Sequence, residues 1–485
     1  MRTFETGEIT LREVREHVWE IPAEGGMEVP ARVFASEALL EEIADDRTLR
    51  QLKNATHLPG IRKYAICMPD GHQGYGFPVG GVAGIDAETG CISPGAIGYD
   101  INCGVRMLRT DLEYDDVRGR EEELVEALFE AIPSGLGGGG VIDGDHGALE
   151  AALERGVEWC LEAGYAVESD LEHCEDNGVR RDADPDAVPQ RAKDRGQNQM
   201  GSLGSGNHFL EVQRVAEVFD GATADAYGLG DEQVVVLIHC GSRGLGHQLC
   251  TEYLRRIEDA HGELLDRLPD KELAAAPAGS ELAEAYYGAM CAAINFAWVN
   301  RQLITHRTRA VFAETFDEPW EALGMELLYD VAHNVAKKET HDVDGEDREL
   351  YVHRKGATRA FPAGRPEVPA AYRDVGQPVI IPGSMGAGSY VLRGGARSLD
   401  VSFGSTAHGA GRLMSRTRAK DEFRGGDVRD ELRDREVYLK AQNGATIAEE
   451  APGVYKDVDE VVRVSEALGI GDPVVRVEPV CNIKG

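Results

Sequence analysis

Three short apolar segments of this chain end at residues that can carry chemistry, and this pattern restricts the folds open to it. Residues 234–238 read Val-Val-Val-Leu-Ile and are followed by His239. Residues 327–332 lead in the same way to His333, and residues 379–382 lead into a glycine-rich stretch. Short β-branched runs of this kind are typical of buried strands, and folds that mix strands and helices place ligands in the loops beyond strand ends. The pattern predicts active-site loops at strand ends.

The rest of the chain supplies helical patterns and polar stretches, with no internal repeat and no obvious linker. We therefore predict one large α+β (mixed α/β) domain over residues 1–485, with central β-sheets. Residues 248–315 are predicted to be a helical excursion within it, and the polar residues 170–196 a surface insertion. Helices are further predicted at 36–52, 121–131 and 149–163, loops at 135–140 and 343–376, and a polar segment after residue 411.

The charge balance restricts partners and solvent. The chain carries 85 acidic residues against 51 basic ones, a formal charge of −34, and only eleven of the bases are lysine. Such repulsion keeps a protein dissolved but opposes compaction unless salt screens it. The composition resembles that of proteins from salt-loving archaea, so we predict a halophilic protein. Enzymes of nucleic acids usually carry a basic surface, and composition alone argues against a polyanionic substrate.

The nine cysteines include no Cys-x-x-Cys pair and predict reduced thiols rather than a disulfide framework. The N-terminus has no signal-peptide core, and no apolar run is long enough to cross a membrane. These features predict a cytoplasmic protein with no membrane partner.

A glycine-flanked carboxylate and thiol, Asp100 and Cys103, form the first candidate metal site. Alone, the pair is weak, and each of the downstream histidines could be a hydrogen-bonded core or loop residue. Together, five ligands exceed what one structural zinc ion needs. A thiolate can bridge two ions, so the set favours a two-metal site that suits Mn²⁺ or Zn²⁺. The histidines of the set are His208, His239 and His333.

Two glycine-rich segments, 383–389 and 404–411, expose backbone N–H groups as anion-binding loops do. Neither is a P-loop, and either could be a simple turn. His408, inside the second segment and followed by Arg412 and Arg416, suggests a nucleophilic or acid–base imidazole beside a phosphoryl group. A third loop at 68–78 contains Asp70 and His72, with a rigid structural turn as the alternative.

These motifs, in their order along the chain, resemble the RtcB-type tRNA-splicing RNA ligase family. The resemblance covers the chain from about Ala65 to Gly485. It rests on Asp-Ile-Asn-Cys-Gly-Val-Arg, Gly-Asn-His-Phe, His-Cys-Gly-Ser-Arg-Gly, Ala-His-Asn, Gly-Ser-Met-Gly, Ala-His-Gly-Ala-Gly-Arg and the terminal Lys-Gly.

The resemblance implies roles for particular residues. His408 would be the nucleophile that takes GMP from GTP, with Asp70, Arg243 and Arg412 as accessory active-site residues. Cys103 would bridge two Mn²⁺ ions, which Asp100, His208, His239 and His333 would also bind. The implied guanylate pocket comprises Asn207, Phe209, Glu211, Ser384, Ser389, Tyr455 and Lys484.

The implied reaction joins an RNA 2′,3′-cyclic phosphate or 3′-phosphate to a 5′-hydroxyl through histidine–GMP and RNA(3′)pp(5′)G intermediates. tRNA halves would be the substrates, and an archease-type protein a candidate activator. The acidic, lysine-poor chain departs from this pattern, so phosphate recognition is predicted to rest on the metals and on Arg243, Arg354, Arg412 and Arg416. The alternatives are a dinuclear metallohydrolase, such as a phosphatase without a nucleotide step, and a non-catalytic RNA-repair scaffold.

Overall fold

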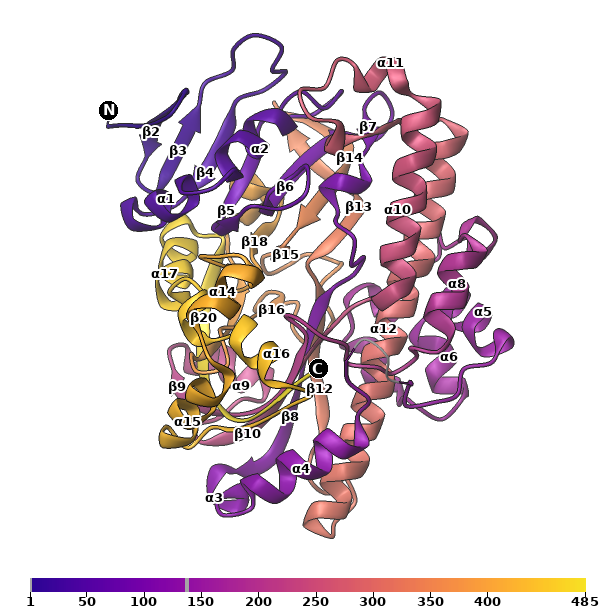
Figure 1. Ribbon diagram of the computed structural model, residues 1–485, viewed down its shortest axis with the longest axis vertical. Coiled ribbons are helices and arrows are strands. Elements are labelled where there is room, and N and C mark those ends of the chain that lie inside the picture. The colour runs from indigo at the N-terminus through magenta and orange to yellow at the C-terminus, as the bar shows by residue number, and fades with distance from the viewer. Residues whose placement is uncertain (1, 136–138) are drawn as a thin grey trace.

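Two large β-sheets dominate the computed structural model, which describes residues 2–135 and 139–485 (Figure 1). The predicted loop at 135–140 therefore lies partly outside the described residues. The first sheet has the order β1-β2-β3-β4-β5-β6-β14-β13 and is antiparallel except between β4 and β5. Its strands are β1 (Thr3–Thr6), β2 (Ile9–Arg15), β3 (Val18–Ile21), β4 (Ala31–Phe34), β5 (Ala65–His72), β6 (Val79–Asp86), β13 (Asn334–Val343) and β14 (Glu346–Lys355).

The second sheet has the order β12-β8-β10-β9-β20-β17-β16, and β19 pairs in parallel with β20. Its strands are β8 (Gly104–Glu113), β9 (Phe209–Val218), β10 (Gln233–Cys240), β12 (Glu326–Ala332), β16 (Pro378–Ile381), β17 (Ser389–Gly394), β19 (Tyr438–Ala441) and β20 (Gly471–Lys484). Two short pairs, β7 (Cys91–Ile92) with β11 (Ala276–Pro277) and β15 (Ala357–Arg359) with β18 (Ser405–Ala407), complete the strands of the described residues. The predicted α+β architecture with central sheets is confirmed.

The register of the second sheet brings five strand ends to one edge. Because neighbouring strands are antiparallel, β8 and β9 begin where β10, β12 and β20 end. Gly104 pairs with both Cys240 and Ala332, and Phe209 pairs with both His239 and Lys484. Residues just before or after these positions must therefore lie close together, although they are hundreds of positions apart in the sequence.

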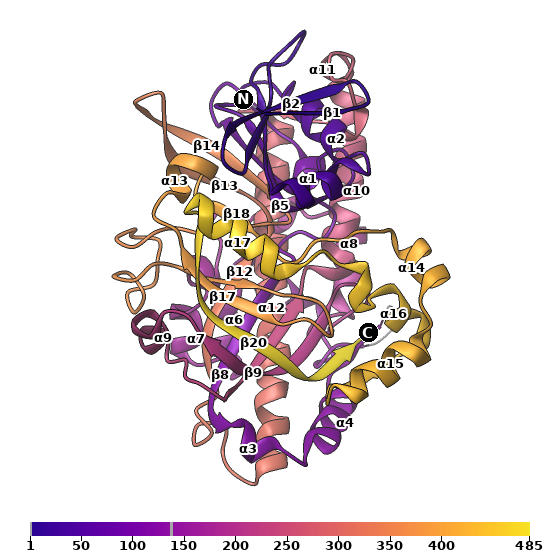
Figure 2. The ribbon, with the colours of Figure 1, turned by 90° about the vertical axis from the view of Figure 1, so that its left-hand side faces the viewer.

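Two long helices, α10 (Arg243–Ala260) and α12 (Glu281–Phe316), run along one side of both sheets (Figures 1 and 2). Most of α12 is buried, because it packs against helices on one side and β10 on the other. The other helices are α1 (Glu37–Ala44), α2 (Thr48–Ala55), α3 (Tyr114–Val117), α4 (Glu121–Ala131), α5 (His146–Arg155), α6 (Val157–Glu162), α7 (Glu168–Glu172), α8 (Gln190–Gln197), α9 (Gly221–Tyr227), α11 (Gly262–Leu265), α13 (Ser398–Ser402), α14 (Arg416–Glu422), α15 (Gly425–Asp434), α16 (Gly444–Glu449) and α17 (Val458–Leu468).

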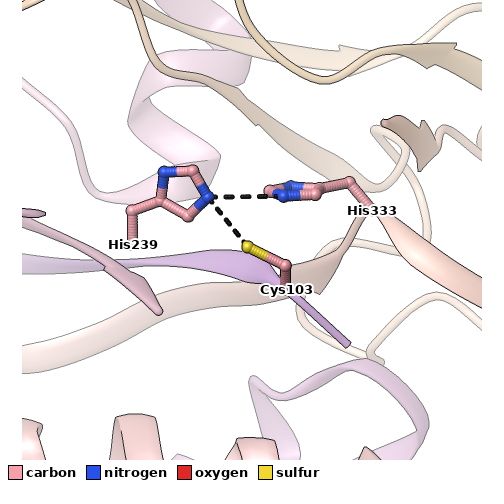
Figure 3. A group of neighbouring side chains, drawn as sticks. All are labelled: Cys103, His239 and His333. Carbon is pink, nitrogen blue, oxygen red and sulfur yellow. Dashed lines mark hydrogen bonds between the residues drawn. The ribbon is translucent and has the colours of Figure 1, made fainter. Parts of the chain in front are cut away.

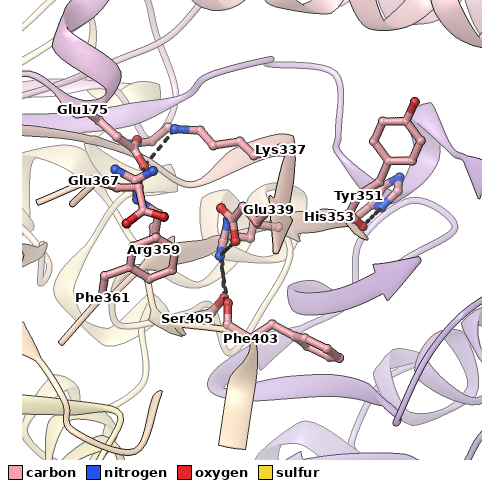
Figure 4. Close-up of polar contacts among 12 residues, drawn as sticks. Glu175, Lys337, Glu339, Tyr351, His353, Arg359, Phe361, Glu367, Phe403 and Ser405 are labelled. Atoms are coloured by element: carbon pink, nitrogen blue, oxygen red, sulfur yellow. Dashed lines mark hydrogen bonds and ion pairs between the residues drawn. The ribbon is translucent and has the colours of Figure 1, made fainter. Parts of the chain in front are cut away.

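The segment 170–196, predicted as a surface insertion, contributes charges to the protein interior. The side chain of Asp170 is fully buried and that of Glu175 is nearly so. Glu175 lies 2.9 Å from the ammonium of Lys337 and 3.1 Å from Nε of Arg359 (Figure 4). Buried cations are tolerated only when they are paired and hydrogen-bonded. The segment mixes buried and exposed residues, and its buried acids neutralise cations of both the helices and the sheets, since Asp170 pairs with Arg309 of α12.

All nine cysteines are buried with free thiols. Within the described part of the chain, no helix combines the length and the apolar character that a membrane crossing requires.

Candidate metal and nucleotide site

The predicted metal ligands converge at the edge where the five strands end, and Cys103 lies at their centre. Its Sγ is 3.3 Å from Nε2 of His208 and 3.3 Å from Nε2 of His239. The Nε2 atoms of His239 and His333 lie 3.3 Å apart (Figure 3), and a carboxylate oxygen of Asp100 lies 2.8 Å from Nε2 of His208. The five side chains form two groups of three that share Cys103.

The donor atoms of each group are spaced for a shared cation. Within a group they all lie within 4.8 Å of one another, which suits ion–ligand bonds of about 2.0–2.3 Å. The Nδ1 atom of His208 lies 3.1 Å from the carbonyl oxygen of Leu203. The guanidinium of Arg243 lies 2.9 Å from the same Nδ1. Burial lowers the pKa of His208, but Cys103 and Asp100 outweigh it and raise this pKa, so a bound cation would have to displace a proton from the ring.

Burial sets the protonation of this cluster. It raises the pKa of the Cys103 thiol to about 11, and the nearby Asp100 carboxylate adds to this effect. It also lowers the pKa of His239 and His333, which therefore stay neutral. Burial opposes ionisation of Asp100, but the charge of His208 outweighs it and lowers the pKa of Asp100 to about 2. A bound cation would convert the thiol into a thiolate, so the residues fit a metal site.

His408 follows β18 and lies beside the metal cluster. Its Nδ1 is 2.5 Å from a carboxylate oxygen of Asp70 on β5, and its backbone N–H donates to the same oxygen at 3.1 Å. Its ring centroid lies 4.8 Å from that of His333. Only glycine fits at Gly411, where a Cβ would lie 2.1 Å from the Asp70 carbonyl oxygen. Because Asp70 occupies Nδ1, Nε2 is the ring nitrogen left free for attack.

A pocket joins His408 and the metal cluster to the two glycine-rich segments. It is lined by His408, His239 and His333 together with the loops after β16 and β18. Six of the seven residues predicted to hold guanylate line it, whereas Ser389 lies behind it and accepts a hydrogen bond from the Gly383 N–H at 3.1 Å. The six are Asn207, Phe209, Glu211, Ser384, Tyr455 and Lys484.

Glu211 is the buried acid of this pocket. Burial raises its pKa to about 8, although the nearby Lys484 favours the ionised form. One carboxylate oxygen accepts a hydrogen bond from Gln213 at 2.7 Å, and the other accepts one from Asn482. Ionised Glu211 can only accept hydrogen bonds, whereas the protonated form carries an O–H donor and has less acceptor capacity for the N–H groups of a bound base.

Glu450 is a residue of this site that the sequence analysis missed. Its fully buried carboxylate lies behind the pocket wall. It accepts a hydrogen bond from Arg412 at 3.0 Å and another from the Tyr455 hydroxyl. It also lies 3.6 Å from the Lys484 ammonium and 3.8 Å from Nε of Arg416. Nothing in the sequence Ala-Glu-Glu-Ala around it signals this role, because Arg412, Arg416 and Lys484 come from distant positions.

The four arginines predicted to recognise phosphate differ in whether they line the pocket. Arg412 and Arg416 line the pocket. Arg243 instead begins α10 with a left-handed φ of 55°, and its guanidinium lies 2.9 Å from Nδ1 of His208. The prediction that Arg354 binds phosphate is wrong. Its buried guanidinium is held by Glu339 at 2.7 and 2.9 Å and by two further acceptors.

The fold and the site together define a large α+β enzyme in which a carboxylate-oriented histidine lies next to a cysteine–histidine cluster. The family model of the tRNA-splicing ligase RtcB matches residues 51–485. The chain is 54% identical to the tRNA-splicing ligase RtcB of Thermococcus kodakarensis, over 98% of this chain and 99% of that protein. It is 52% identical to the corresponding protein of Aeropyrum pernix, over 98% and 100%. The chain belongs to the RtcB family and is therefore an enzyme of the ligase class.

Proposed function

We propose that this protein is a GTP- and Mn²⁺-dependent RNA ligase. It joins RNA ends that carry a 2′,3′-cyclic phosphate or a 3′-phosphate to RNA ends that carry a 5′-hydroxyl. One observation carries the proposal: a single pocket is lined by a histidine oriented by a carboxylate, by His239 and His333 of a ligand cluster centred on Cys103, and by a buried acid for a base. The names of the relatives support RNA as the substrate, with tRNA halves as the natural ends.

In the first step, Nε2 of His408 attacks the α-phosphate of GTP, a P–N bond forms, and pyrophosphate leaves. Asp70 holds the proton on Nδ1 and stabilises the positive charge that develops on the ring. Glu211, Tyr455 and Lys484 would bind the guanine, with the Glu211 carboxylate accepting from its N–H groups.

The ligands of two Mn²⁺ ions would be Asp100, Cys103, His208, His239 and His333. When bound, such ions supply Lewis-acid stabilisation of the charge on the reacting phosphates. Burial keeps His239 and His333 neutral, so their lone pairs are free of protons before a cation binds.

In the later steps a cyclic end is first hydrolysed to a 3′-phosphate. This phosphate takes GMP from His408, giving RNA(3′)pp(5′)G, and His408 regains its neutral ring. The 5′-hydroxyl then attacks the 3′-phosphorus, a phosphodiester forms, and GMP leaves. Stimulation by an archease-type protein and a cytoplasmic location belong to the same proposal.

An RNA-joining assay tests the function. The chain is incubated with Mn²⁺, GTP, one RNA ending in a 2′,3′-cyclic phosphate and a second, labelled RNA beginning with a 5′-hydroxyl. We expect a joined product that requires GTP and that His408→Ala abolishes. His146→Ala serves as the matched control, because this exposed histidine of α5 is remote from the pocket residues. Release of phosphate without joining would identify a metallohydrolase and contradict the proposal.

A further inference from the structure

We propose that Asn300 and Arg301, in the middle of α12, are positioning residues for the metal site. They hold the backbone segments from which Cys103, His208 and His239 project. The inference rests on the proposed function, because it assigns the two residues a role toward the ions that this function needs.

Arg301 connects three strands at the edge where the site lies. Its Nη1 donates to the carbonyl oxygens of Asn102 at 2.8 Å and of Cys240 at 2.7 Å. Its Nε and Nη2 each donate to the Asp330 carboxylate at 2.8 Å. Asn102 lies just before β8, Cys240 is the last residue of β10, and Asp330 lies within β12. One guanidinium therefore fixes the backbone next to two proposed ligands, Cys103 and His239, and is itself held by Asp330 of β12.

Asn300 holds the loop that leads to His208. Its Oδ1 accepts hydrogen bonds from the backbone N–H groups of Gly201 at 2.6 Å and Ser202 at 3.0 Å. Its Nδ2 donates to the carbonyl oxygen of Gly241 at 3.1 Å. The loop continues to Leu203, whose carbonyl oxygen lies 3.1 Å from Nδ1 of His208. Asn300 therefore links this loop to the end of β10.

A purely structural role does not account for a charge at this position. Arg301 is fully buried, and a buried ion pair is often no more stabilising than apolar residues of the same volume. The planar guanidinium can donate five hydrogen bonds in fixed directions, which an ammonium or an apolar side chain cannot reproduce. Its directed contacts end on backbone beside proposed metal ligands, and groups that orient ligands typically alter metal affinity by about 10–100-fold when they are changed.

The helix also supplies a matched control. Arg309 lies two turns further along α12 and is also buried. It donates to both oxygens of Asp170 at 2.7 Å and to the Met325 carbonyl oxygen at 3.0 Å. None of these partners neighbours a proposed metal ligand, so Arg309→Lys disturbs a comparable buried pair away from the site.

The test is calorimetric titration of Mn²⁺ into the full-length chain, Arg301→Lys and Arg309→Lys. Thermal unfolding with and without Mn²⁺ is the second readout, since an ion that binds only the folded state raises Tm. We expect both variants to lose stability, but only Arg301→Lys to bind Mn²⁺ about 10–100-fold more weakly. Asn300→Asp, which keeps the acceptor and removes the donor, is expected to weaken binding in the same direction.

Wild-type affinity in Arg301→Lys, or an equal loss in Arg309→Lys, would overturn the inference while leaving the proposed function intact. If Arg301→Lys does not fold, wild-type affinity in Asn300→Asp overturns it. A wild-type chain that binds no Mn²⁺ would overturn the proposed function as well.

Discussion

Cys103 is the residue on which the two ligand groups converge. Its Sγ lies 3.3 Å from the Nε2 atoms of two histidines, in surroundings that raise the pKa of the thiol to about 11. Without a cation the residue is a neutral thiol at physiological pH. A cation is therefore the agent that would make it a ligand, and metal binding should release a proton.

Asp70 sets the reactive nitrogen of His408. In Asp70→Asn the side-chain amide can donate to Nδ1, which favours the tautomer that carries its proton on Nε2. We expect transfer of GMP to the protein to slow by about 100-fold or more, while Mn²⁺ affinity stays unchanged because Asp70 belongs to neither ligand group. Single-turnover labelling with α-labelled GTP measures the rate. An unchanged rate would show that the carboxylate does not select the tautomer.

Glu211 predicts a pH dependence of guanine binding. Its pKa is raised to about 8 by burial, so in the free protein the carboxyl is mainly neutral at pH 7 and accepts poorly from guanine. GTP affinity should therefore rise between about pH 7 and pH 9. Titrations at several pH values measure this, and the difference between the chain and Glu211→Gln isolates the group from the metal ligands. An equal pH dependence in both proteins would contradict the assignment.

The raised pKa of Glu211 favours GTP binding at high pH but favours the folded state at low pH. Between the ordinary carboxyl pKa and about 8, Glu211 is protonated in the folded chain and ionised in the unfolded one. Its contribution to the free energy of unfolding is thus present at low pH and is lost as the pH rises through about 8.

The sequence predicted the site residues that carry unusual local signals. Cys103 between glycines and His239 after an apolar run can be recognised without a structure. Glu450 and Arg301 cannot, because their importance arises from partners that only the folded chain brings together. Arg354 shows the converse error: the sequence analysis assigns this arginine to phosphate, but it neutralises the buried Glu339.

At the scale of elements, the site depends on how closely β8 and β12 approach at Gly104. A Cβ there would lie 2.5 Å from the Val331 carbonyl oxygen. Gly104→Ala should push β12 away, separate His333 from Cys103 and weaken Mn²⁺ binding, with a loss of about 1–3 kcal/mol in stability. Gly230→Ala is the control, since nothing lies within 4 Å of the added Cβ. Wild-type Mn²⁺ affinity in Gly104→Ala would contradict this dependence on strand spacing.

Some elements could be predicted from local pattern and others could not. The helix predicted at 121–131 coincides with α4, and the run 234–238 lies within β10. Strand β14 was missed inside a predicted loop region because its first four residues are charged and exposed. Strand β20 was missed because it contains two prolines, which usually exclude a central strand; register shifts in its pairing with β9 and β17 accommodate them.

At the scale of the whole molecule, the chain combines a charge of −34 with a substrate that is a polyanion. Although the chain is acidic as a whole, basic side chains gather where the polyanionic substrate would bind. Arg412, Arg416 and Lys484 gather around the pocket, and a single buried acid, Glu450, holds them in place. The exposed acidic residues elsewhere decide solvation rather than chemistry.

The charge predicts a salt requirement. At about 1 M salt the Debye length falls to about 3 Å, so repulsion among the exposed carboxylates is screened. Tm should rise steadily as KCl increases toward molar concentrations, and activity should follow it. Thermal unfolding is measured in KCl and in sucrose. Sucrose is excluded from the protein surface but carries no charge, so only KCl can screen repulsion among the carboxylates. Full stability in dilute buffer would contradict the halophilic interpretation.

The most direct test of the whole account is transfer of label from α-labelled GTP to the protein in the presence of Mn²⁺. We predict an acid-labile, covalently bound label that maps to His408, requires Mn²⁺ and is absent from His408→Ala. The His146→Ala control should label normally. A chain that binds Mn²⁺ and GTP but forms no such adduct, or that is labelled equally without His408, would contradict the central claim.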